Sequence, residues 1–140
     1  MIQGTAERAT SCEWHLDGFQ PIVARRMAES TLTLWGVPAE TIDDAKLITS
    51  EVATNAAKHV HPELRRAGFI HFRISLSGDT LRFEISDPDS RPPLLIRAAH
   101  DDEQYRGLTI VDALAKDWGF EAAASGIGKV IWWAQIISHP

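Results

Sequence analysis

The sequence predicts an α/β (α+β) fold in which helices and antiparallel β-hairpins follow one another in blocks. Two early segments, residues 21–34 and 39–59, carry apolar residues at helical spacing. Residues 70–76 and 81–87 then alternate between apolar and polar residues on either side of a Gly-Asp turn. A third helical segment and a second hairpin complete the chain. Blocks of helices and hairpins in this order are typical of an α+β domain.

Length and composition limit the classes of protein to which the chain can belong. Its 140 residues fit one domain, residues 1–140, and the first thirteen or so predict an arm or an edge strand. A net charge of -5 argues against direct nucleic-acid binding. No apolar run approaches the roughly 18 residues of a membrane span, and the N-terminus has no apolar signal region. We therefore expect a cytoplasmic protein that does not bind membranes.

The first helix is predicted over residues 21–34. Proline suits its first turn, and Gly36 and Pro38 end it. We expect its apolar stripe to face the core, and the stripe consists of Ile22, Val23, Met27, Thr31 and Leu34.

The second helix is predicted from Ala39 to His59, with acidic residues in its early turns. The predicted buried stripe consists of Ile42, Ala45, Ile48, Val52, Ala53, Ala56 and Val60. Glu51, Asn55 and His59 follow at four-residue intervals along the edge of that stripe. They are either the wall of a cleft or the solvated flank of an amphipathic helix.

Asp87 ends the second strand of the first predicted hairpin. It is in phase with the inward series of Leu81, Phe83 and Ile85. A carboxylate on a buried face is costly unless a donor hydrogen-bonds to it. The exocyclic amino group of a purine would be such a donor. Alternatively, Asp87 caps the turn that it forms with Pro88.

The segment from residue 88 to 105 is rich in proline and charge and predicts a lid or binding loop. Helical spacing resumes from Leu108 to Trp118, with Gly119 ending the helix. Arg106 and Gly107 would lie at its N-terminus, where free N–H groups can hold an anion. The same pair also fits an ordinary junction between a loop and a helix.

The C-terminal residues predict a second hairpin, with strands over residues 120–124 and 130–137. The nearly continuous apolar run from Val130 to Trp133 predicts a central strand covered on both faces. We expect the tryptophans of this run to belong to the core.

Three motifs in this order resemble a known family: the EVATN box on a helix, the strand ending in Asp87 with Pro-Asp-Ser after it, and RGLTIV at the start of a helix. The order is similar to the ATP-binding domain shared by histidine kinases, gyrase and Hsp90. Size and spacing most resemble the small stand-alone branch of bacterial anti-sigma factors with serine protein kinase activity. The resemblance covers about residues 14–137. It implies a two-layer sandwich with a mixed, mainly antiparallel sheet covered on one face by about three helices.

The resemblance also implies roles for individual residues. Asn55 would be the ligand of a Mg²⁺ ion that bridges the phosphates of ATP. Glu51 would be the catalytic general base that takes the proton of a protein serine hydroxyl. Asp87 would accept a hydrogen bond from the adenine amino group. The other residues expected to bind the nucleotide are Lys58, His59, Arg106, Gly107 and Leu108.

Several positions depart from the pattern of the family. Val60 and Asp89 stand where glycine is usual, and Tyr105 stands at the first glycine of a Gly-x-Gly pattern. Val130 occupies the place of a threonine that commonly supports the adenine pocket. We therefore expect nucleotide affinity to be weak, or to depend on a partner that orders the lid.

The resemblance implies a serine/threonine-protein kinase that regulates bacterial transcription by partner switching. It would bind a sigma factor or an anti-sigma factor antagonist, and it would phosphorylate a serine of the antagonist. Homodimerisation is implied as well. The alternative is a noncatalytic regulatory module with the same fold, which acts through protein contacts. The ATP-binding half of a histidine kinase is disfavoured, because no helix with a phosphoacceptor histidine precedes the motifs.

Overall fold

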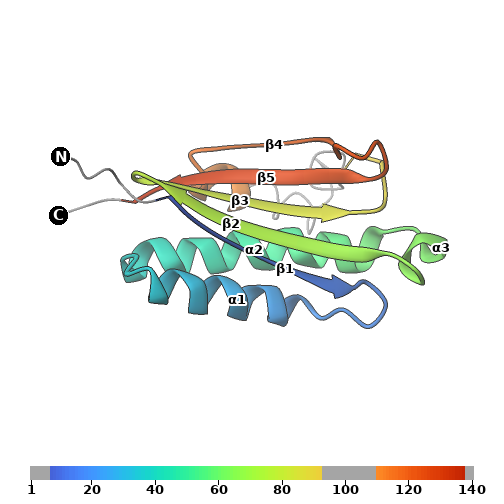
Figure 1. Ribbon diagram of the computed structural model, residues 1–140, viewed down its shortest axis with the longest axis horizontal. Helices are drawn as coiled ribbons and strands as arrows, with labels where there is room; N and C mark the ends of the chain where they lie inside the picture. The colour runs from blue at the N-terminus through green and yellow to red at the C-terminus, as the bar shows by residue number, and fades with distance from the viewer. Residues whose placement is uncertain (1–6, 93–109, 138–140) are drawn as a thin grey trace.

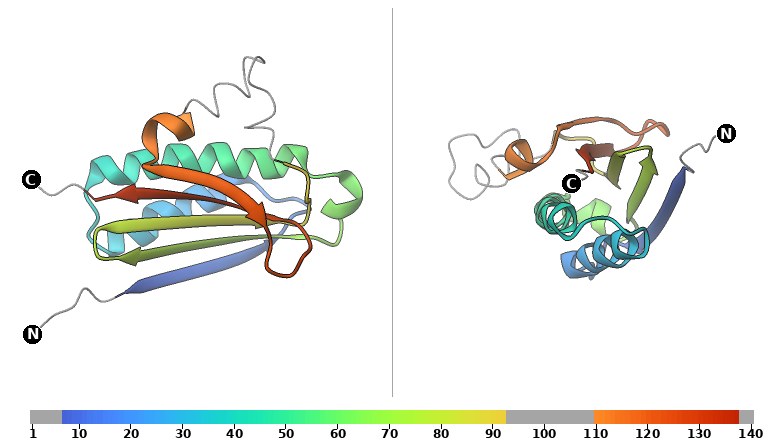
Figure 2. Two further views of the ribbon diagram at one scale, coloured as in Figure 1. Left: turned by 90° about the horizontal axis from the view of Figure 1, so that it is seen from above. Right: turned by 90° about the vertical axis from the view of Figure 1, so that its left-hand side faces the viewer.

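One antiparallel sheet and two long helices form the two layers of the molecule (Figure 1). The structure is a computed structural model that describes residues 7–92 and 110–137. Five strands hydrogen-bond in the order β1-β2-β3-β5-β4, and α1 and α2 lie side by side across one face of the sheet (Figure 2). The predicted two-layer α+β sandwich is confirmed. The sheet is antiparallel at every described pairing, whereas a mixed sheet was predicted.

Helices α1 (Pro21–Leu34) and α2 (Ala39–His59) have the predicted bounds. Proline lies in the first turn of α1, and Gly36, with a φ of 74°, allows the chain to turn after it. The predicted stripe of α2 is buried throughout. Its residues face the sheet because their spacing places them on one side of the helix. None of the described helices is long and apolar enough to span a membrane.

The predicted core face of α1 is wrong in part, since Val23 and Met27 pack against the core but its two ends do not. Ile22 is 46% exposed and Leu34 is 81% exposed, whereas Ala24, Ala28 and Leu32 are buried. Small side chains at positions 24 and 28 leave room for the backbone of α1 to approach its neighbour. Alanine contributes little to a hydrophobic pattern, which explains why the sequence indicated a neighbouring stripe.

The first hairpin matches its prediction closely. Strands β2 (Phe69–Ser77) and β3 (Thr80–Asp87) pair antiparallel, with Ser77 opposite Thr80. Gly78 has a φ of 62° in the connecting turn. The inward residues of both strands are buried, apart from Leu76, which is partly buried and packs against the core. Strand β1 (Arg8–His15) pairs with β2 at the margin of the sheet, so this N-terminal stretch is an edge strand.

The last part of the chain differs from the prediction. Residues 110–114 are helical, but β4 begins at Asp117 and runs to Ala122, so Trp118 and Gly119 lie in a strand. Trp118 pairs with Trp133 of β5 (Lys129–Ile136). Gly119 lies against Trp132, since a Cβ at residue 119 would be 3.2 Å from the indole nitrogen. Tertiary pairing with β5 therefore overrides the helical spacing of the sequence.

Strand β5 lies between β3 and β4, as the apolar run predicted for a central strand. Trp133 is buried and stacks on Phe83 with a centroid separation of 4.9 Å. Trp132 points to the opposite face, is only half-buried, and carries the Arg82 guanidinium 4.6 Å from its ring centre. The run was predicted to be covered on both faces; α1 and α2 cover one face of this strand, and its outward residues before Ile136 are only partly buried.

Candidate functional site

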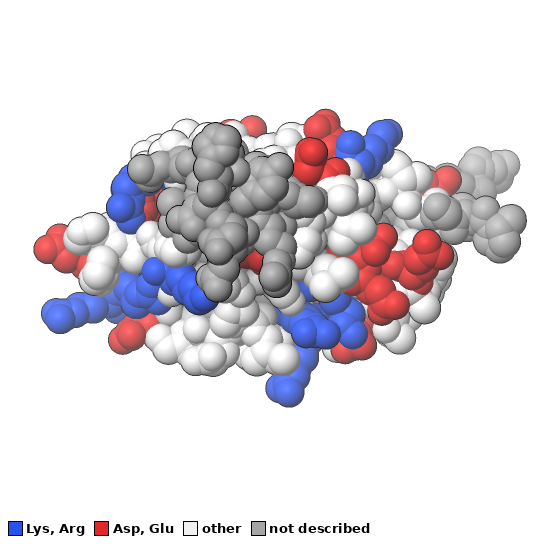
Figure 3. All heavy atoms as spheres, turned by 180° about the vertical axis from the view of Figure 1, so that it is seen from behind, with Lys and Arg blue, Asp and Glu red and all other residues white. Residues whose placement is uncertain are grey.

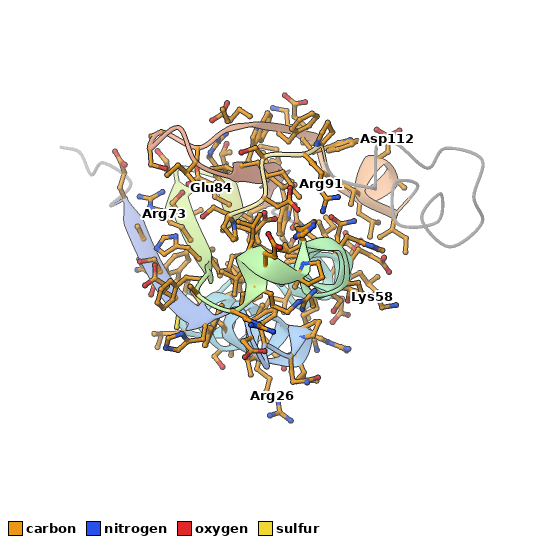
Figure 4. The ribbon with its side chains drawn as sticks, turned by 90° about the vertical axis from the view of Figure 1, so that its right-hand side faces the viewer. Arg26, Lys58, Arg73, Glu84, Arg91 and Asp112 are labelled. Atoms are coloured by element: carbon orange, nitrogen blue, oxygen red, sulfur yellow. The ribbon has the colours of Figure 1, made fainter. Side chains whose placement is uncertain are left out.

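A pocket of about 310 Å³ lies at the end of the molecule where α2 ends and β3 ends. It is lined by Asn55, residues 58–62, Arg65 of α3 (Pro62–Arg65), Asp87, Asp89, Arg91, Pro92 and Lys129. Figure 4 looks at this end of the molecule. Lys58 and Arg91 lie on the side of α2, whereas Arg73 and Glu84 lie on the sheet. Segments distant in the sequence therefore converge on one hollow.

Asn55 is a buried amide on the wall of this pocket. It is 7% exposed and follows Val52 and Ala53, whose side chains anchor this turn of α2 in the core. Within residues 7–92 and 110–137, no side chain or backbone group hydrogen-bonds to the Asn55 amide. The amide is not among the fully buried polar atoms that lack a partner, so it keeps access to the open pocket, where a ligand or water can bond to it. Asn55 is therefore suited to hold a polar ligand in the pocket.

Asp87 is a buried carboxylate on the opposite wall. It is 5% exposed, and its Oδ1 accepts hydrogen bonds from the backbone N–H of Asp89 at 2.8 Å and from Lys129 Nζ at 3.1 Å. Among the described residues, no hydrogen bond reaches its Oδ2. Burial raises the pKa of Asp87, although the charge of Lys129 and the N–H of Asp89 act in the opposite direction. The side chain thus offers a free acceptor oxygen for a ligand.

Lys129 is the partner that the sequence interpretation missed. It lies opposite Asp87 in the register of β3 and β5, and both side chains are almost fully buried. Its ammonium also donates to the backbone carbonyl of Asp89 at 2.8 Å. The signal was present, because Lys129 shares the inward phase of Ile131, Trp133 and Gln135.

Asp89 stands where the family that the motifs resemble usually has glycine. Its charge lies in the pocket lining but is paired. Its carboxylate accepts hydrogen bonds from the Arg91 guanidinium and from the backbone N–H of His61 at 3.0 Å. Arg91 also donates to the carbonyl of His59 at 3.0 Å. The Arg91 hydrogen bonds hold the pKa of Asp89 far below its usual range. This cluster, which we call the Asp89 clamp, ties the chain after β3 to the end of α2.

Gly128 brings the turn before β5 against the end of β3. Its φ is 86°, and a Cβ at this position would collide with the backbone carbonyl oxygen of Asp87. Its N–H donates to Ser90 Oγ at 3.0 Å. Because only glycine fits this approach, the turn places Lys129 directly beside Asp87.

The mouth of the pocket is basic. Lys58, Arg65 and Arg91 surround it, and burial, followed by the charges of Lys58 and Arg91, lowers the pKa of His59. Figure 3 shows basic side chains toward the α3 end of that face and a group of acidic side chains toward the end where α2 begins. The basic side chains of Lys58, Arg65 and Arg91 favour an anionic ligand at this mouth.

The structure brings four of the predicted site residues together: Asn55, Lys58, His59 and Asp87 line one pocket. Glu51 is half-buried one helical turn before Asn55 and does not line this pocket. Arg106, Gly107 and Leu108, together with the predicted lid from residue 93 to 105, lie outside the described residues.

The residues of the pocket fit a nucleotide carrying Mg²⁺ better than a metal held by protein alone. Among the described residues, no group of three or more His, Cys, Asp or Glu side chains could hold a metal ion. Mg²⁺ commonly takes one or two protein oxygens and completes its shell with phosphates and water. The Asn55 amide could supply such an oxygen, the basic mouth suits phosphates, and the Asp87 oxygen suits an amino group.

Comparison with known proteins agrees with this arrangement. The sequence model of one protein family, the histidine kinase-like ATPase domain, matches residues 20–133 of this chain. Since this match covers well over half of the sequence, the chain belongs to that family. The family that its three motifs resemble in the sequence is thereby confirmed.

Several curated relatives are named serine-protein kinase RsbW. Those from Staphylococcus aureus strains MRSA252 and Newman are each 36% identical over 52 residues, which is 37% of this chain and 33% of the relative. The chain thus matches about a third of the length of these relatives.

Two solved structures share the fold. The RsbU and RsbW domains of Rv1364c from Mycobacterium tuberculosis match 94% of this chain and 33% of that chain, with a TM-score of 0.68 and 19% identity. The histidine kinase domain of the blue-light activated histidine kinase EL346 from Erythrobacter litoralis matches 84% of this chain and 60% of that chain, with a TM-score of 0.59 and 22% identity.

Proposed function

We propose that the protein binds ATP with Mg²⁺ in the pocket between α2 and the end of β3, and that it uses this nucleotide as a regulatory serine protein kinase. The observation that carries the proposal is the placement of Asn55 and Asp87 on the walls of one pocket. They lie 32 positions apart in the sequence, and each presents a buried polar group toward the same space. Membership in a family of ATPase domains supports ATP as the ligand.

Each proposed contact follows from the chemistry of the side chain. Asp87 accepts a hydrogen bond from the amino group of adenine through Oδ2. Asn55 would hold the metal ion through its side-chain amide oxygen, and the chemistry that the ion would supply is positive charge beside the phosphates. Lys58 and His59 contact phosphate oxygens, and the flexible stem of Lys58 lets its three N–H donors reach them. Arg106, Gly107 and Leu108 complete the phosphate side through backbone N–H groups and the guanidinium.

Glu51 is the proposed general base. Its carboxylate lies one turn before Asn55, on the same side of α2. It takes the proton of a serine hydroxyl as the serine oxygen attacks the terminal phosphorus of ATP. The bond from that phosphorus to the bridging oxygen breaks, so the products are phosphoserine and ADP. The position of Glu51 outside the pocket lining fits a group that meets the protein substrate rather than the nucleotide.

The proposed substrate is an anti-sigma factor antagonist, and the proposed competing partner is a sigma factor. The name of the serine-protein kinase RsbW relatives and the likeness to the RsbW domain of Rv1364c support this assignment. Phosphorylation adds close to two negative charges to the antagonist and thereby changes its affinity. We propose that the protein acts in the cytoplasm as a homodimer and as a single domain over residues 1–140.

Transfer of labelled phosphate from ATP tests the kinase. We expect a serine of one antagonist in a panel to be labelled, and Glu51→Gln to lower the rate about 10²- to 10⁴-fold while ATP still binds. Glu40→Gln, the same change in the first turn of α2, is the control and should leave the rate unchanged. Folded protein that binds ATP but labels no antagonist would overturn the kinase assignment.

A noncatalytic regulatory module is the second candidate function. The observation that favours it is the pairing of Asp87 with Lys129 and of Asp89 with Arg91, which balances the charge of two pocket carboxylates without a nucleotide. In this case Asn55→Ala would leave the affinity for a sigma factor or an antagonist intact. If the kinase proposal holds, partner affinity in the presence of ATP changes with the same substitution. Surface plasmon resonance with each partner, with and without ATP, separates the two functions.

A further inference from the structure

Lys129 and Asp87 form a buried ion pair in the lining of the pocket. Lys129 Nζ lies 3.1 Å from Asp87 Oδ1, and the two side chains are 7% and 1% exposed. Desolvation of two charges often cancels the attraction between them, so a buried pair is weak evidence for a role in stability. The pair lies in the pocket lining and not in the apolar core. Its position therefore points to a role in binding.

The hydrogen bonds leave one donor and one acceptor unused. An ammonium group has three N–H donors, and Lys129 directs two of them to Asp87 Oδ1 and to the Asp89 carbonyl. Asp87 Oδ1 receives Lys129 and the Asp89 N–H, while Oδ2 receives no hydrogen bond from the described residues. One N–H of Lys129 and one oxygen of Asp87 remain at the pocket wall. A donor and an acceptor side by side match the edge of a base that offers an acceptor beside an amino group.

We propose that Lys129 is a positioning residue for the base of the bound nucleotide. By holding Oδ1 it orients the Asp87 carboxylate, and Oδ2 then accepts from the amino group of adenine. Its remaining N–H donates to the adjacent ring nitrogen. This inference rests on the proposed ATP site, and it assigns to that site a residue that neither the sequence motifs nor the comparisons indicate.

The chemistry of the pair explains why a lysine serves here. A buried carboxylate that picks up a proton loses one acceptor oxygen, and burial raises the pKa of Asp87. The ammonium of Lys129 acts against this shift and so favours the ionised form, in which both oxygens can accept. Gly128 enforces the contact, because the close approach of its backbone to Asp87 brings the next residue into register with the carboxylate.

The test compares two ligands that differ in one group: ATP and purine riboside 5′-triphosphate, which lacks the amino group. We expect calorimetric titration with Mg²⁺ to show that wild-type protein binds ATP at least about tenfold more tightly than the analogue. Lys129→Met should reduce this ratio toward one. A purely structural defect would weaken both ligands equally and keep the ratio, so the ratio isolates the positioning role.

Two further variants make the result decisive. Lys129→Gln keeps a hydrogen-bond donor without the charge and replaces Lys129→Met if thermal unfolding shows that the methionine variant does not fold. Lys46→Met, which removes a lysine paired with Glu29 away from the pocket, is the matched control and should keep the wild-type ratio.

The outcomes separate this inference from the proposed function. If wild-type protein binds ATP and the ratio is unchanged in the Lys129 variants, Lys129 does not position the base, while the ATP site stands. If removal of Lys129 strengthens ATP binding, the ammonium competes with the base and the inference is overturned. If wild-type protein binds neither ligand, the proposed function fails and the inference fails with it.

Discussion

At the scale of single residues, buried charges and their partners determine what the pocket can bind. The Asp89 clamp is the clearest case. Asp89 is 4% exposed, and the Arg91 guanidinium contacts both of its carboxylate oxygens. Because the ionised form is the one that is hydrogen-bonded, the clamp contributes stability only while Asp89 carries its charge. The charged residues beside the pocket therefore also hold its walls together.

We predict that Arg91→Met lowers the melting temperature at pH 7 by roughly 3–6 °C, since it removes the main partner of a buried carboxylate. The pKa of Asp89 is lower in the folded protein than in the unfolded chain. Its contribution is therefore complete above about pH 4 and is lost as the pH falls toward the lowered value. The difference between wild type and variant should shrink on acidification from pH 7 to pH 3, as measured by circular dichroism.

The control for this prediction is Arg73→Met, the same change at an exposed residue on the sheet. It should shift the melting temperature little at either pH. An Arg91→Met variant as stable as wild type at pH 7 would show that the clamp does not stabilise the fold.

The alternation of residues along β3 predicted the buried Asp87 but not the partner that it pairs with. The inward phase of Asp87 indicated a buried carboxylate, which the structure confirms at 5% exposure. Its partner Lys129 was missed because the sequence of neither strand alone determines the register in which β3 pairs with β5. The burial of Asp89 was missed for a similar reason, since its partners Arg91 and His61 meet it only in the folded chain.

At the scale of elements, turns and helix faces place the site. The turn before β5 carries two glycines with positive φ, Gly126 at 82° and Gly128 at 86°. Only Gly128 lies against the end of β3, where a Cβ would meet the backbone of Asp87 and Pro88. One glycine thus serves the turn alone, while the other also joins the two strands at the pocket.

We predict that Gly128→Ala destabilises the protein by about 3 kcal/mol or more, because a left-handed alanine and a backbone collision act together. Gly126→Ala should cost only about 1–2 kcal/mol, since a Cβ there meets no atom within 4 Å. Urea unfolding of both variants measures the difference. Equal costs would show that the approach of the turn to β3 is not restrictive.

Helix α2 carries Asn55 into the pocket through its buried face. Ile48 on that face is fully buried, and the neighbouring Leu47 is 51% exposed. We predict that Ile48→Ala costs about 2–5 kcal/mol of unfolding free energy. Leu47→Ala, an aliphatic truncation one position away, should cost about 0.5 kcal/mol or less. Similar losses for the two variants in urea unfolding would contradict the assigned helix face.

Elements with strong periodicity were predictable, and those defined by tertiary pairing were not. The bounds of α1 and α2 follow from Pro21, Gly36 and the apolar stripe of α2. The helix predicted to extend to Trp118 ends at residue 114, because β4 pairs with β5 from Asp117 onward. Local spacing fits both a helix and a strand there, and only the partner strand decides between them.

At the scale of the whole molecule, the site lies at one end of the two-layer sandwich, the end near α3. The sheet and the helices bury an apolar core between them, and polar residues of α2, β3 and β5 emerge beyond it at the end near α3. The sequence order of the three motifs predicted the α+β sandwich and the convergence of Asn55 with Asp87. The order of the motifs did not predict the positive charge around the mouth of the pocket. That charge depends on Arg65 and Arg91 lining the same pocket as Lys58.

The most direct test of the account is isothermal titration of the protein with ATP and Mg²⁺. We expect one nucleotide per chain to bind, and binding to weaken at least about tenfold in Asn55→Ala and in Asp87→Asn. Asp43→Asn, an exposed carboxylate on the same helix, should keep the wild-type affinity. Affinity that is equal in all four proteins, or absent from the folded wild type, would show that these two walls do not form an ATP site.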